Sequence, residues 1–248
     1  SELYDGETYD AAFEPSVWTP AVICDGPTDT LIEQQGEPVR EQERIAPARI
    51  FKTPAGEIVV DFGQNLTGYV EIALDGVKGE AVELSHAEVL DKNGNFYTEN
   101  YRSAKAKYLY FCKDGAQRYK PKLTFYGFRY IRVDRFPCGA EHVAQENFTA
   151  IAVHSDMKRT GYLSCSDPLL NKLFENVIWG QKSNFLDVPT DCPQRDERLG
   201  WTGDAQASIR AIACTFDGKR FFSKWLRDMA AEQRGDGTVS HFVPNVGL

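Results

Sequence analysis

The chain has 248 residues, a length that predicts one or two domains, and its hydrophobic fraction of 42% and charged fraction of 26% are typical of globular proteins. The formal net charge of −8 argues against nucleic acid and anionic membranes as partners, because both require a basic face. No apolar run approaches the roughly 20 residues that cross a bilayer.

The two chain features that bear on compartment are the N-terminus and the cysteines. Ser1 to Asp5 carry neither a basic start nor an apolar stretch, so no signal peptide is recognisable, and there is no initiator Met. We therefore expect a chain cut from a longer protein. The 6 cysteines form no Cys-x-x-Cys pair, which excludes zinc-site spacing and predicts free buried thiols. The compartment stays open, with a lean toward a reducing, cytoplasmic one.

The first two thirds of the chain divide into an arm and a β region. Residues 1–45 are rich in Pro, Gly, Glu and Gln, and we expect an extended arm or the tail of an upstream domain. Residues 46–156 contain short segments rich in β-branched and aromatic residues, separated by turns with Gly or Asn. This pattern predicts an antiparallel β-sandwich. The expected strands lie near 57–62, 69–74, 81–86, 107–112, 129–134 and 147–153.

From residue 157 onward the apolar spacing becomes helical. Asp167 before Pro168 is a typical helix start, and a second helix is expected over 204–216, closed by Gly218. A third helix ends before Gly235. Two apolar stripes lack partners, because the sequence ends before it supplies many further helices, and we expect them to seek cover by self-association or by packing on the sandwich. The stripes are Leu169, Leu173 and Val177, and Phe222, Trp225 and Met229.

A polar loop, residues 187–204, joins the first two predicted helices. Its last fourteen residues, from Asp191 to Asp204, carry most of its charged side chains. These residues include four carboxylates, two arginines and a tryptophan, while prolines and glycines prevent a regular helix. The set suits sugar chemistry, because carboxylates accept hydroxyl protons, arginine donates in a fixed fork and an indole packs on the C–H face of a sugar. We expect Asp191, Arg195, Glu197 and Asp204 to converge at the mouth of a depression.

Simpler interpretations of this loop stay open. It could be a solvated acidic loop in which Asp204 caps the second helix and Arg195 pairs with Asp196. A calcium site is disfavoured, because the alternation Asp-x-Asp-x-Asp-Gly is absent. A sugar-cleaving loop also needs one carboxyl that stays protonated. Neighbouring carboxylates would raise the pKa of Glu197, whereas Arg195 and Arg198 would lower it, and the sequence leaves this balance open.

The loop from Asp191 to Asp204 resembles the signature loop of bacterial α-L-rhamnosidases, glycoside hydrolase family 78, almost without a break. Other segments resemble the accessory β domain and the concanavalin-like domain that precede the catalytic domain in that family. These are Tyr4-Asp-Gly-Glu7, Trp18-Thr-Pro20, Asp61-Phe-Gly-Gln-Asn65, His86-Ala-Glu88 and Phe125-Tyr-Gly-Phe-Arg-Tyr130. The resemblance implies that 1–45 is the tail of an accessory β domain, 46–156 the sandwich, and 157–248 the first helices of an incomplete (α/α)6 barrel.

The resemblance also implies roles for the matching loop residues. Glu197 corresponds to the general acid and Trp201 to an aromatic wall of the sugar pocket. Asp191, Arg195 and Asp204 correspond to side chains that hold the rhamnose hydroxyls. Family members invert the anomeric centre, so they need a second carboxylate as base, roughly 6.5–9.5 Å from the acid. In the family this base is a glutamate late in the barrel, and the sequence ends before reaching it.

We therefore expect a section of an inverting α-L-rhamnosidase that acts on terminal α-L-rhamnose in oligosaccharides or plant glycosides. No metal or cofactor is expected, since this hydrolysis uses carboxylates and water. The alternative is a non-catalytic carbohydrate-binding or structural β-sandwich module, which substitutions in the 191–204 loop would leave unaffected. Because the base is missing, we expect this chain alone to be inactive.

Overall fold

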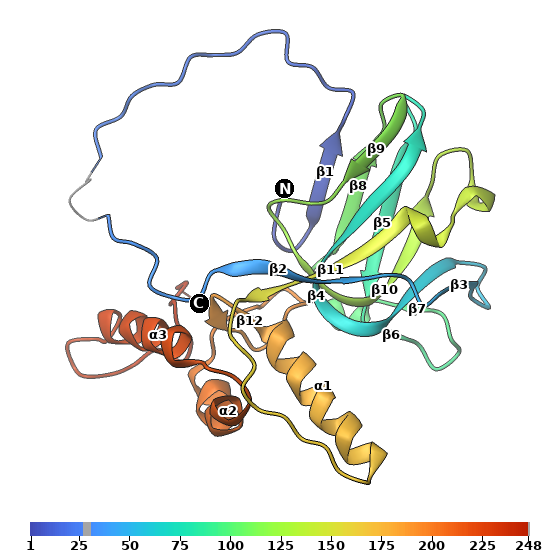
Figure 1. The fold of residues 1–248 in the computed structure, drawn as a ribbon. Helices are drawn as coiled ribbons and strands as arrows, with labels where there is room; N and C mark the ends of the chain where they lie inside the picture. Colours follow the sequence, from blue (N-terminus) through green and yellow to red (C-terminus); the bar gives the residue numbers. More distant parts are fainter. Residues whose placement is uncertain (27–30, 248) are drawn as a thin grey trace.

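The computed structural model of the chain describes residues 1–26 and 31–247, and it consists of a curled β-sheet followed by three helices (Figure 1). This order confirms the predicted β-sandwich followed by the first helices of a helical domain. Among the described residues, no helix is both long enough and apolar enough to cross a membrane.

Nine strands form the main sheet, and the long strand β4 pairs with four of the others. The order along the sheet is β1 (Gly6–Asp10), β8 (Lys107–Phe111), β5 (Ala81–Ala87), β10 (Tyr126–Arg135), β4 (Ile58–Gly76), β11 (Phe148–Ser155) and β2 (Val39–Ile45). β3 (Arg49–Lys52) and β9 (Gly115–Tyr119) pair with further stretches of β4. Neighbours are antiparallel, as predicted, except that β1 runs parallel to β8.

Short elements connect these strands and lead into the helices. Two hairpins of two-residue strands pair β6 (Val89–Leu90) with β7 (Phe96–Tyr97), and β12 (Phe185–Leu186) with β13 (Val188–Pro189). Three short 3₁₀ turns are η1 (Glu99–Tyr101), η2 (Ala140–His142) and η3 (Gln145–Asn147). The β12–β13 hairpin and η1 both lie next to the polar loop that the sequence singled out, so they are relevant to the site.

Strand β4 unites two of the predicted strands, 57–62 and 69–74, into one strand of 19 residues. β10 pairs with residues 59–61 and 66–68 of β4, and its register shifts between Phe128 and Tyr130, where residues 62–65 are left out of the ladder. At Gly68 the backbone passes so close to β11 that a Cβ would lie 1.8 Å from the carbonyl oxygen of Ile151. The local pattern therefore predicts two strands, whereas tertiary pairing makes them one, around which the sheet curls (Figure 1).

The interior of the curled sheet is closed by its own side chains. Along β8 the alternation of period two places Tyr108 and Tyr110 inside and leaves Lys107 exposed. The core contains Val60, Leu66, Val70, Ile72, Val82, Leu84, Phe128 and Ile131, each fully buried. Burying one such side chain stabilises the fold by about 1.5–3 kcal/mol, so these residues are the main favourable contribution to the stability of the sheet.

The N-terminal 45 residues are only in part the arm that composition predicted. Residues 11–26 and 31–38 form no strand or helix, and residues 11–26 arch away from the body of the molecule (Figure 1). Gln35 and Glu37, in contrast, contact Arg220 of the helical part. Gly6–Asp10 and Val39–Ile45, however, are β1 and β2 of the main sheet. The sheet thus extends beyond the expected start at residue 46, because pairing with distant strands decides the outcome. Residues 27–30 and 248, which the predicted arm and helical region include, lie outside the described residues.

The three helices begin close to where the sequence predicts them. In α1 (Pro168–Asn184), the Asp167 carboxylate accepts the Leu169 N–H at 2.8 Å, which confirms the predicted cap. α2 (Thr202–Thr215) begins at Thr202 rather than at Asp204 and has Trp201 as its N-cap residue, so Asp204 lies within the first turn instead of capping it. The prediction that Gly218 closes α2 was wrong. Gly218 precedes α3 (Lys219–Ala231) with φ −88, and Phe216 ends α2.

The two apolar stripes of the helical part have different environments. Phe222 and Trp225 are only 8% and 3% exposed, because α2 and the residues around Val243 cover them, so the expectation that this stripe is exposed was wrong. Leu169 and Leu173 of α1 are 78% and 58% exposed, as predicted. One face of α1 therefore lies open to solvent.

Candidate functional site

The predicted polar loop occupies the junction between helices and sheet. It follows the β12–β13 hairpin and packs on β10, where Gly127 leaves room for it, since a Cβ there would lie 2.8 Å from Pro193. Asp191 ties the two ends of the loop together. Its N–H donates to the Leu199 carbonyl, and its Oδ1 accepts the Leu199 N–H, both at 3.0 Å. Sheet and loop are thus held against each other at this point.

A buried arginine, Arg198, fixes the shape of the loop through hydrogen bonds to backbone carbonyls. The Arg198 guanidinium donates to the carbonyl oxygens of Leu3 and Phe125, each at 3.0 Å, and to two carbonyls within the loop itself. The Tyr4 and Phe125 rings pack against it, and burial lowers its pKa from the ordinary arginine value. Because four carbonyls converge on one side chain, Arg198 acts as an internal brace for the loop.

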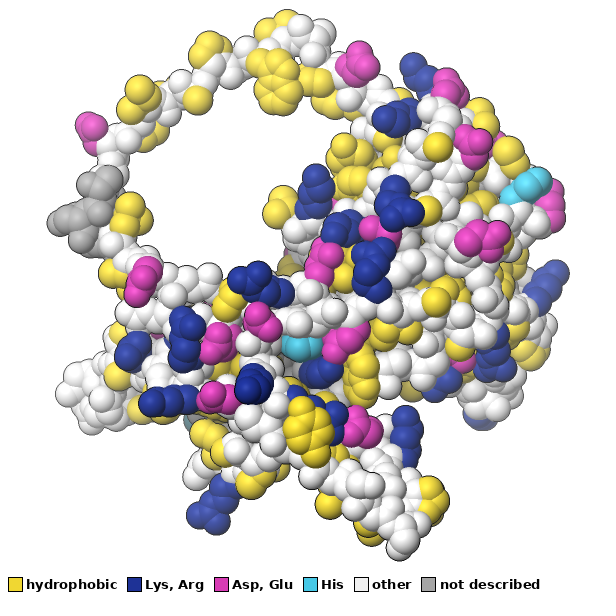
Figure 2. Space-filling model, in the orientation of Figure 1, with side chains coloured by type: hydrophobic (Ala, Val, Ile, Leu, Met, Phe, Trp, Pro, Cys, Tyr) yellow, Lys and Arg dark blue, Asp and Glu magenta, His cyan; other side chains and the backbone are white. Residues whose placement is uncertain are grey.

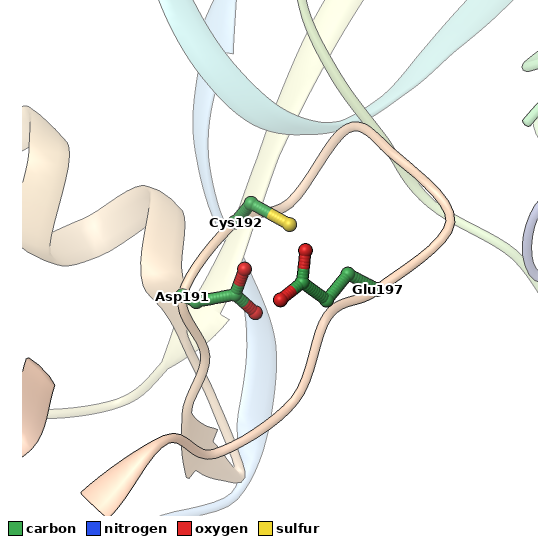
Figure 3. A group of neighbouring side chains, drawn as sticks. All are labelled: Asp191, Cys192 and Glu197. Atoms are coloured by element: carbon green, nitrogen blue, oxygen red, sulfur yellow. The ribbon is translucent and has the colours of Figure 1, made fainter. Parts of the chain in front are cut away.

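The Arg195 guanidinium bridges two of the predicted site carboxylates. Nη2 lies 3.0 Å from Asp191 Oδ2, and Nε donates to Glu197 Oε2 at 2.9 Å. Figure 3 shows that the carboxyl groups of Asp191 and Glu197 face each other, with the Cys192 thiol beside them. The structure thus brings together Asp191, Arg195 and Glu197, as the sequence predicts.

Trp201 contacts the same cluster through its ring nitrogen. The indole N–H donates to Glu197 Oε1 at 3.0 Å, and the ring packs edge-on against Phe242. Both oxygens of Glu197 are therefore engaged, one by an indole and the other by a guanidinium. This arrangement fixes the orientation of the carboxylate that the resemblance assigns as the acid.

Side chains from outside the loop also reach Glu197, and the sequence did not point to them. Arg102, which directly follows η1, donates from Nη1 to Glu197 Oε2 at 3.0 Å. Tyr4 donates its hydroxyl to the Glu197 carbonyl at 3.0 Å, and the Ser103 hydroxyl donates to Asp196. No local pattern predicts these contacts, since the partners are about a hundred or more residues apart in the chain.

The charge of Glu197 follows from these neighbours. Burial alone would raise the pKa of its carboxyl, but the positive charges of Arg195 and Arg102 and the hydrogen bonds from Arg195 and Trp201 outweigh burial. The pKa of Glu197 is therefore lower than that of an ordinary glutamate, and the balance that the sequence left open favours the carboxylate form in this state.

Asp204 lies apart from the Arg195 cluster. It occupies the first turn of α2, where its side chain is exposed and its charge is favourable for the helix dipole. Together with Asp191 it lines a hollow of about 340 Å³ between α1 and α2. The expected convergence therefore holds for three of the four side chains, and Asp204 shares only the hollow with Asp191.

The distances within this cluster would also permit a metal ion. Oxygen atoms of Asp191 and Glu197 and the sulfur of Cys192 lie within 4.8 Å of one another. However, the Arg195 guanidinium already bridges both carboxylates, and burial, with the neighbouring Asp191, raises the pKa of the Cys192 thiol to about 11. A protonated thiol is a poor ligand. The residues present therefore fit a guanidinium between two carboxylates better than they fit a metal.

Two protein families match separate parts of the chain. Residues 51–154 match the family described as the bacterial alpha-L-rhamnosidase concanavalin-like domain. Residues 158–247 match the bacterial alpha-L-rhamnosidase 6 hairpin glycosidase domain, which includes the polar loop. The boundary between the two matches lies at the end of β11, where the sheet gives way to the helical region.

Relatives and solved structures agree with these matches. An alpha-L-rhamnosidase of Streptomyces avermitilis is 38% identical over 100% of this chain, and one of Alteromonas is 40% identical over 98%. The chain spans about a quarter of the length of these relatives, 25% and 28%. The native Aspergillus terreus alfa-L-rhamnosidase structure superposes with a TM-score of 0.92 at 40% identity, covering 99% of this chain and 30% of that one. The structure of the Streptomyces avermitilis enzyme complexed with L-rhamnose superposes with a TM-score of 0.90 at 38% identity, covering 99% of this chain and 25% of that one.

Proposed function

The chain belongs to the bacterial α-L-rhamnosidase family, and on this premise we propose that it carries the acid side of the active site of a glycoside hydrolase. The reaction is removal of terminal α-L-rhamnose from oligosaccharides or plant glycosides, with inversion at the anomeric carbon. The observation that carries the proposal is the cluster around Arg195, in which two carboxylates, a guanidinium and an indole nitrogen meet within hydrogen-bonding distance. A relative whose structure is described as complexed with L-rhamnose supports the choice of sugar.

Each residue of the cluster, and Asp204 in the neighbouring hollow, has a proposed task. Glu197 gives its proton to the leaving oxygen, and Asp191, Arg195 and Asp204 hold the rhamnose hydroxyls. Trp201 forms a wall of the sugar pocket. Binding of the sugar draws the Arg195 fork toward the hydroxyls, which weakens its hold on the Glu197 carboxylate. The pKa of Glu197 then rises, because one of the charges that lower it has moved away.

Inversion requires a second carboxylate that activates water on the opposite face of the sugar, roughly 6.5–9.5 Å from the acid. We propose that a glutamate from later helices of the barrel supplies this base, as the resemblance implies, and that these 248 residues alone turn over no rhamnoside. Support comes from the relatives, of which this chain matches about a quarter.

The division of the chain into domains follows from the same premise. We propose a sandwich domain over 46–156, to which β1 and β2 add strands, and a helical catalytic domain from residue 157 onward. The open face of α1 supports a further proposal, that this stripe associates with a second copy when the chain is isolated.

The first test is Glu197→Gln in the full-length protein, assayed on two rhamnosides that differ only in their leaving group. For a poor leaving group we expect kcat to fall by about 10²–10⁴-fold, because a general acid contributes that much. For an activated aryl rhamnoside the loss should be far smaller, since that group leaves without protonation.

A matched control is Glu175→Gln on α1, whose carboxylate pairs with Arg159 away from the cluster and which should keep the parental kcat. Equal losses on both substrates would assign Glu197 to binding instead. Unchanged kinetics would leave the chain as a non-catalytic carbohydrate-binding or structural module.

A further inference from the structure

The segment after η1 reaches from the sandwich to the acid of the proposed active site. Arg102 Nη1 lies 3.0 Å from Glu197 Oε2 and 3.8 Å from Asp196 Oδ1. The next residue, Ser103, donates its N–H to Asp196 Oδ2 at 3.4 Å and its hydroxyl to the same oxygen. Two neighbouring residues of the sandwich thus contact two neighbouring acids of the loop, which defines a specific register between the two regions.

The backbone of this segment holds an unusual conformation that aims Arg102. Its φ is +55 and its ψ −117, a combination that strains the backbone of any residue other than glycine. Ala106 also has a positive φ of +48, and its N–H donates to the Tyr4 carbonyl at 3.0 Å. On the other side, the buried Tyr101 is anchored through its hydroxyl to the Gly127 carbonyl. Firm anchors on both sides therefore maintain a strained residue whose side chain points at the loop.

The contact differs from an ordinary surface ion pair. Ion pairs between fully exposed side chains contribute little to stability, but the Glu197 side chain is only 18% exposed and its Oε2 accepts from both Arg102 and Arg195. Two guanidinium groups repel each other, and a negative charge on the oxygen that they share offsets this repulsion. The arrangement therefore favours the ionised carboxylate, which is also the form that Glu197 takes after it has given its proton to a leaving group.

We propose that Arg102 is a positioning residue through which the sandwich orients the Glu197 carboxylate and stabilises its ionised form. This rests on the function proposed above for Glu197. Arg195 leaves Glu197 when it turns to the sugar hydroxyls, whereas Arg102 stays and receives the carboxylate once the proton has been transferred. The sandwich is then a working part of the active site rather than only a support for the helices.

Several other charged or titratable groups face Glu197 or its nearest neighbours. They are Asp191, Cys192, Arg195, Asp196 and Arg198 from the loop, Tyr4 from the N-terminal segment, and Glu88 of the sandwich through its interaction with Arg195. Arg102 differs from the two loop arginines because its side chain is 54% exposed and no loop backbone depends on it. Its charge can therefore be removed without dismantling the loop.

The test compares Arg102→Gln and Arg102→Lys in the full-length protein, with Arg118→Gln as control. Arg118 is an exposed sandwich arginine that pairs with Glu71 away from the loop. Loss of the Arg102 charge raises the pKa of Glu197, so the proton is kept to higher pH. With a poor leaving group, the alkaline limb of kcat/KM should move up by about 0.5–1 pH unit in Arg102→Gln. It should stay near the parental position in Arg102→Lys and in Arg118→Gln.

A second measurement needs no activity. The carboxyl carbon of Glu197, identified by its absence in Glu197→Gln, can be titrated by ¹³C NMR, and Arg102→Gln should raise its midpoint by the same amount. The inference would be overturned if Arg102→Gln moved neither the alkaline limb of the pH profile of kcat/KM nor the midpoint of the Glu197 titration. A change confined to KM would also overturn it. If Glu197→Gln itself leaves turnover unchanged while the midpoint still shifts with Arg102→Gln, the proposed function fails and the contact between the two residues stands.

Discussion

The sandwich and the helices differ in how completely each covers its own apolar side chains. Leu66 and Ile72 inside the curled sheet are 0% exposed, whereas Leu169 and Leu173 on α1 are 78% and 58% exposed. The sheet is therefore stabilised by its own contacts, while α1 depends on whatever covers its open face. The polar loop lies between them and is braced on the closed side, through Arg198 and the contact at Gly127. Figure 2 shows hydrophobic side chains, in yellow, uncovered at the outer end of α1.

This comparison explains why an active-site loop can keep its shape beside helices that are only partly covered. Catalytic groups need a rigid support, because small displacements of a reacting group weaken every contact it makes. In this chain the support comes from segments that lead directly into the sheet, since the backbone carbonyls of Leu3, shortly before β1, and of Phe125, just before β10, hold Arg198. The helices contribute the other wall, with Asp204 in the first turn of α2.

The largest expected effect separates a buried leucine of the sheet from an exposed leucine of α1. Leu66→Ala should lower the free energy of unfolding by about 2–5 kcal/mol, because it leaves a cavity in a closed core. Leu173→Ala, the matched control, should change it by no more than about 0.5 kcal/mol. Urea unfolding of both variants checks this. If both substitutions lowered the free energy of unfolding by similar amounts, the apolar face of α1 would have to be as fully covered as the core of the sheet.

A smaller effect is expected where the two regions meet. Glu43 of β2 interacts with His154 of β11 and with Lys182 of α1. Burial alone would raise the pKa of Glu43, but these partners lower it to about 2. Because the folded pKa lies below the unfolded value of 4.5, the contribution is present above about pH 4.5 and is lost as the pH falls toward 2.

Glu43→Gln should therefore lower the free energy of unfolding at pH 7 by about 1–2 kcal/mol, after allowance for partial exposure of the side chain, and much less at pH 2.5. Denaturant unfolding at the two pH values measures the difference, with Glu14→Gln, at an exposed position of the N-terminal arm, as the reference. An equal loss at both pH values would show that this ion pair does not couple the two regions.

Much of the fold and part of the site follow from local patterns in the sequence. Asp167 before Pro168 predicts the start of α1, and the alternation along β8 predicts which tyrosines are buried. Asp191, Arg195 and Glu197 meet as expected because they lie within seven residues of one tightly braced loop.

The features that the sequence did not predict depend on contacts between distant residues. β1 joins the sheet through β8, about a hundred positions later, and β4 becomes one strand because β10 pairs with it on both sides of the bend. The local pattern predicts that Gly218 ends α2, but the helix already ends at Phe216, whose side chain packs in the helical core. Arg102 carries no local signal, since its role depends on Glu197, which is 95 residues away.

The most direct test of the central claim is a crystal structure of the full-length protein with L-rhamnose bound. We expect Asp191 and Arg195 to lie about 2.7–3.2 Å from sugar hydroxyls, with Glu197 facing the anomeric oxygen and Arg102 still in contact with the Glu197 carboxylate. Rhamnose bound elsewhere, with the Arg195 bridge between the two carboxylates undisturbed, would contradict the account.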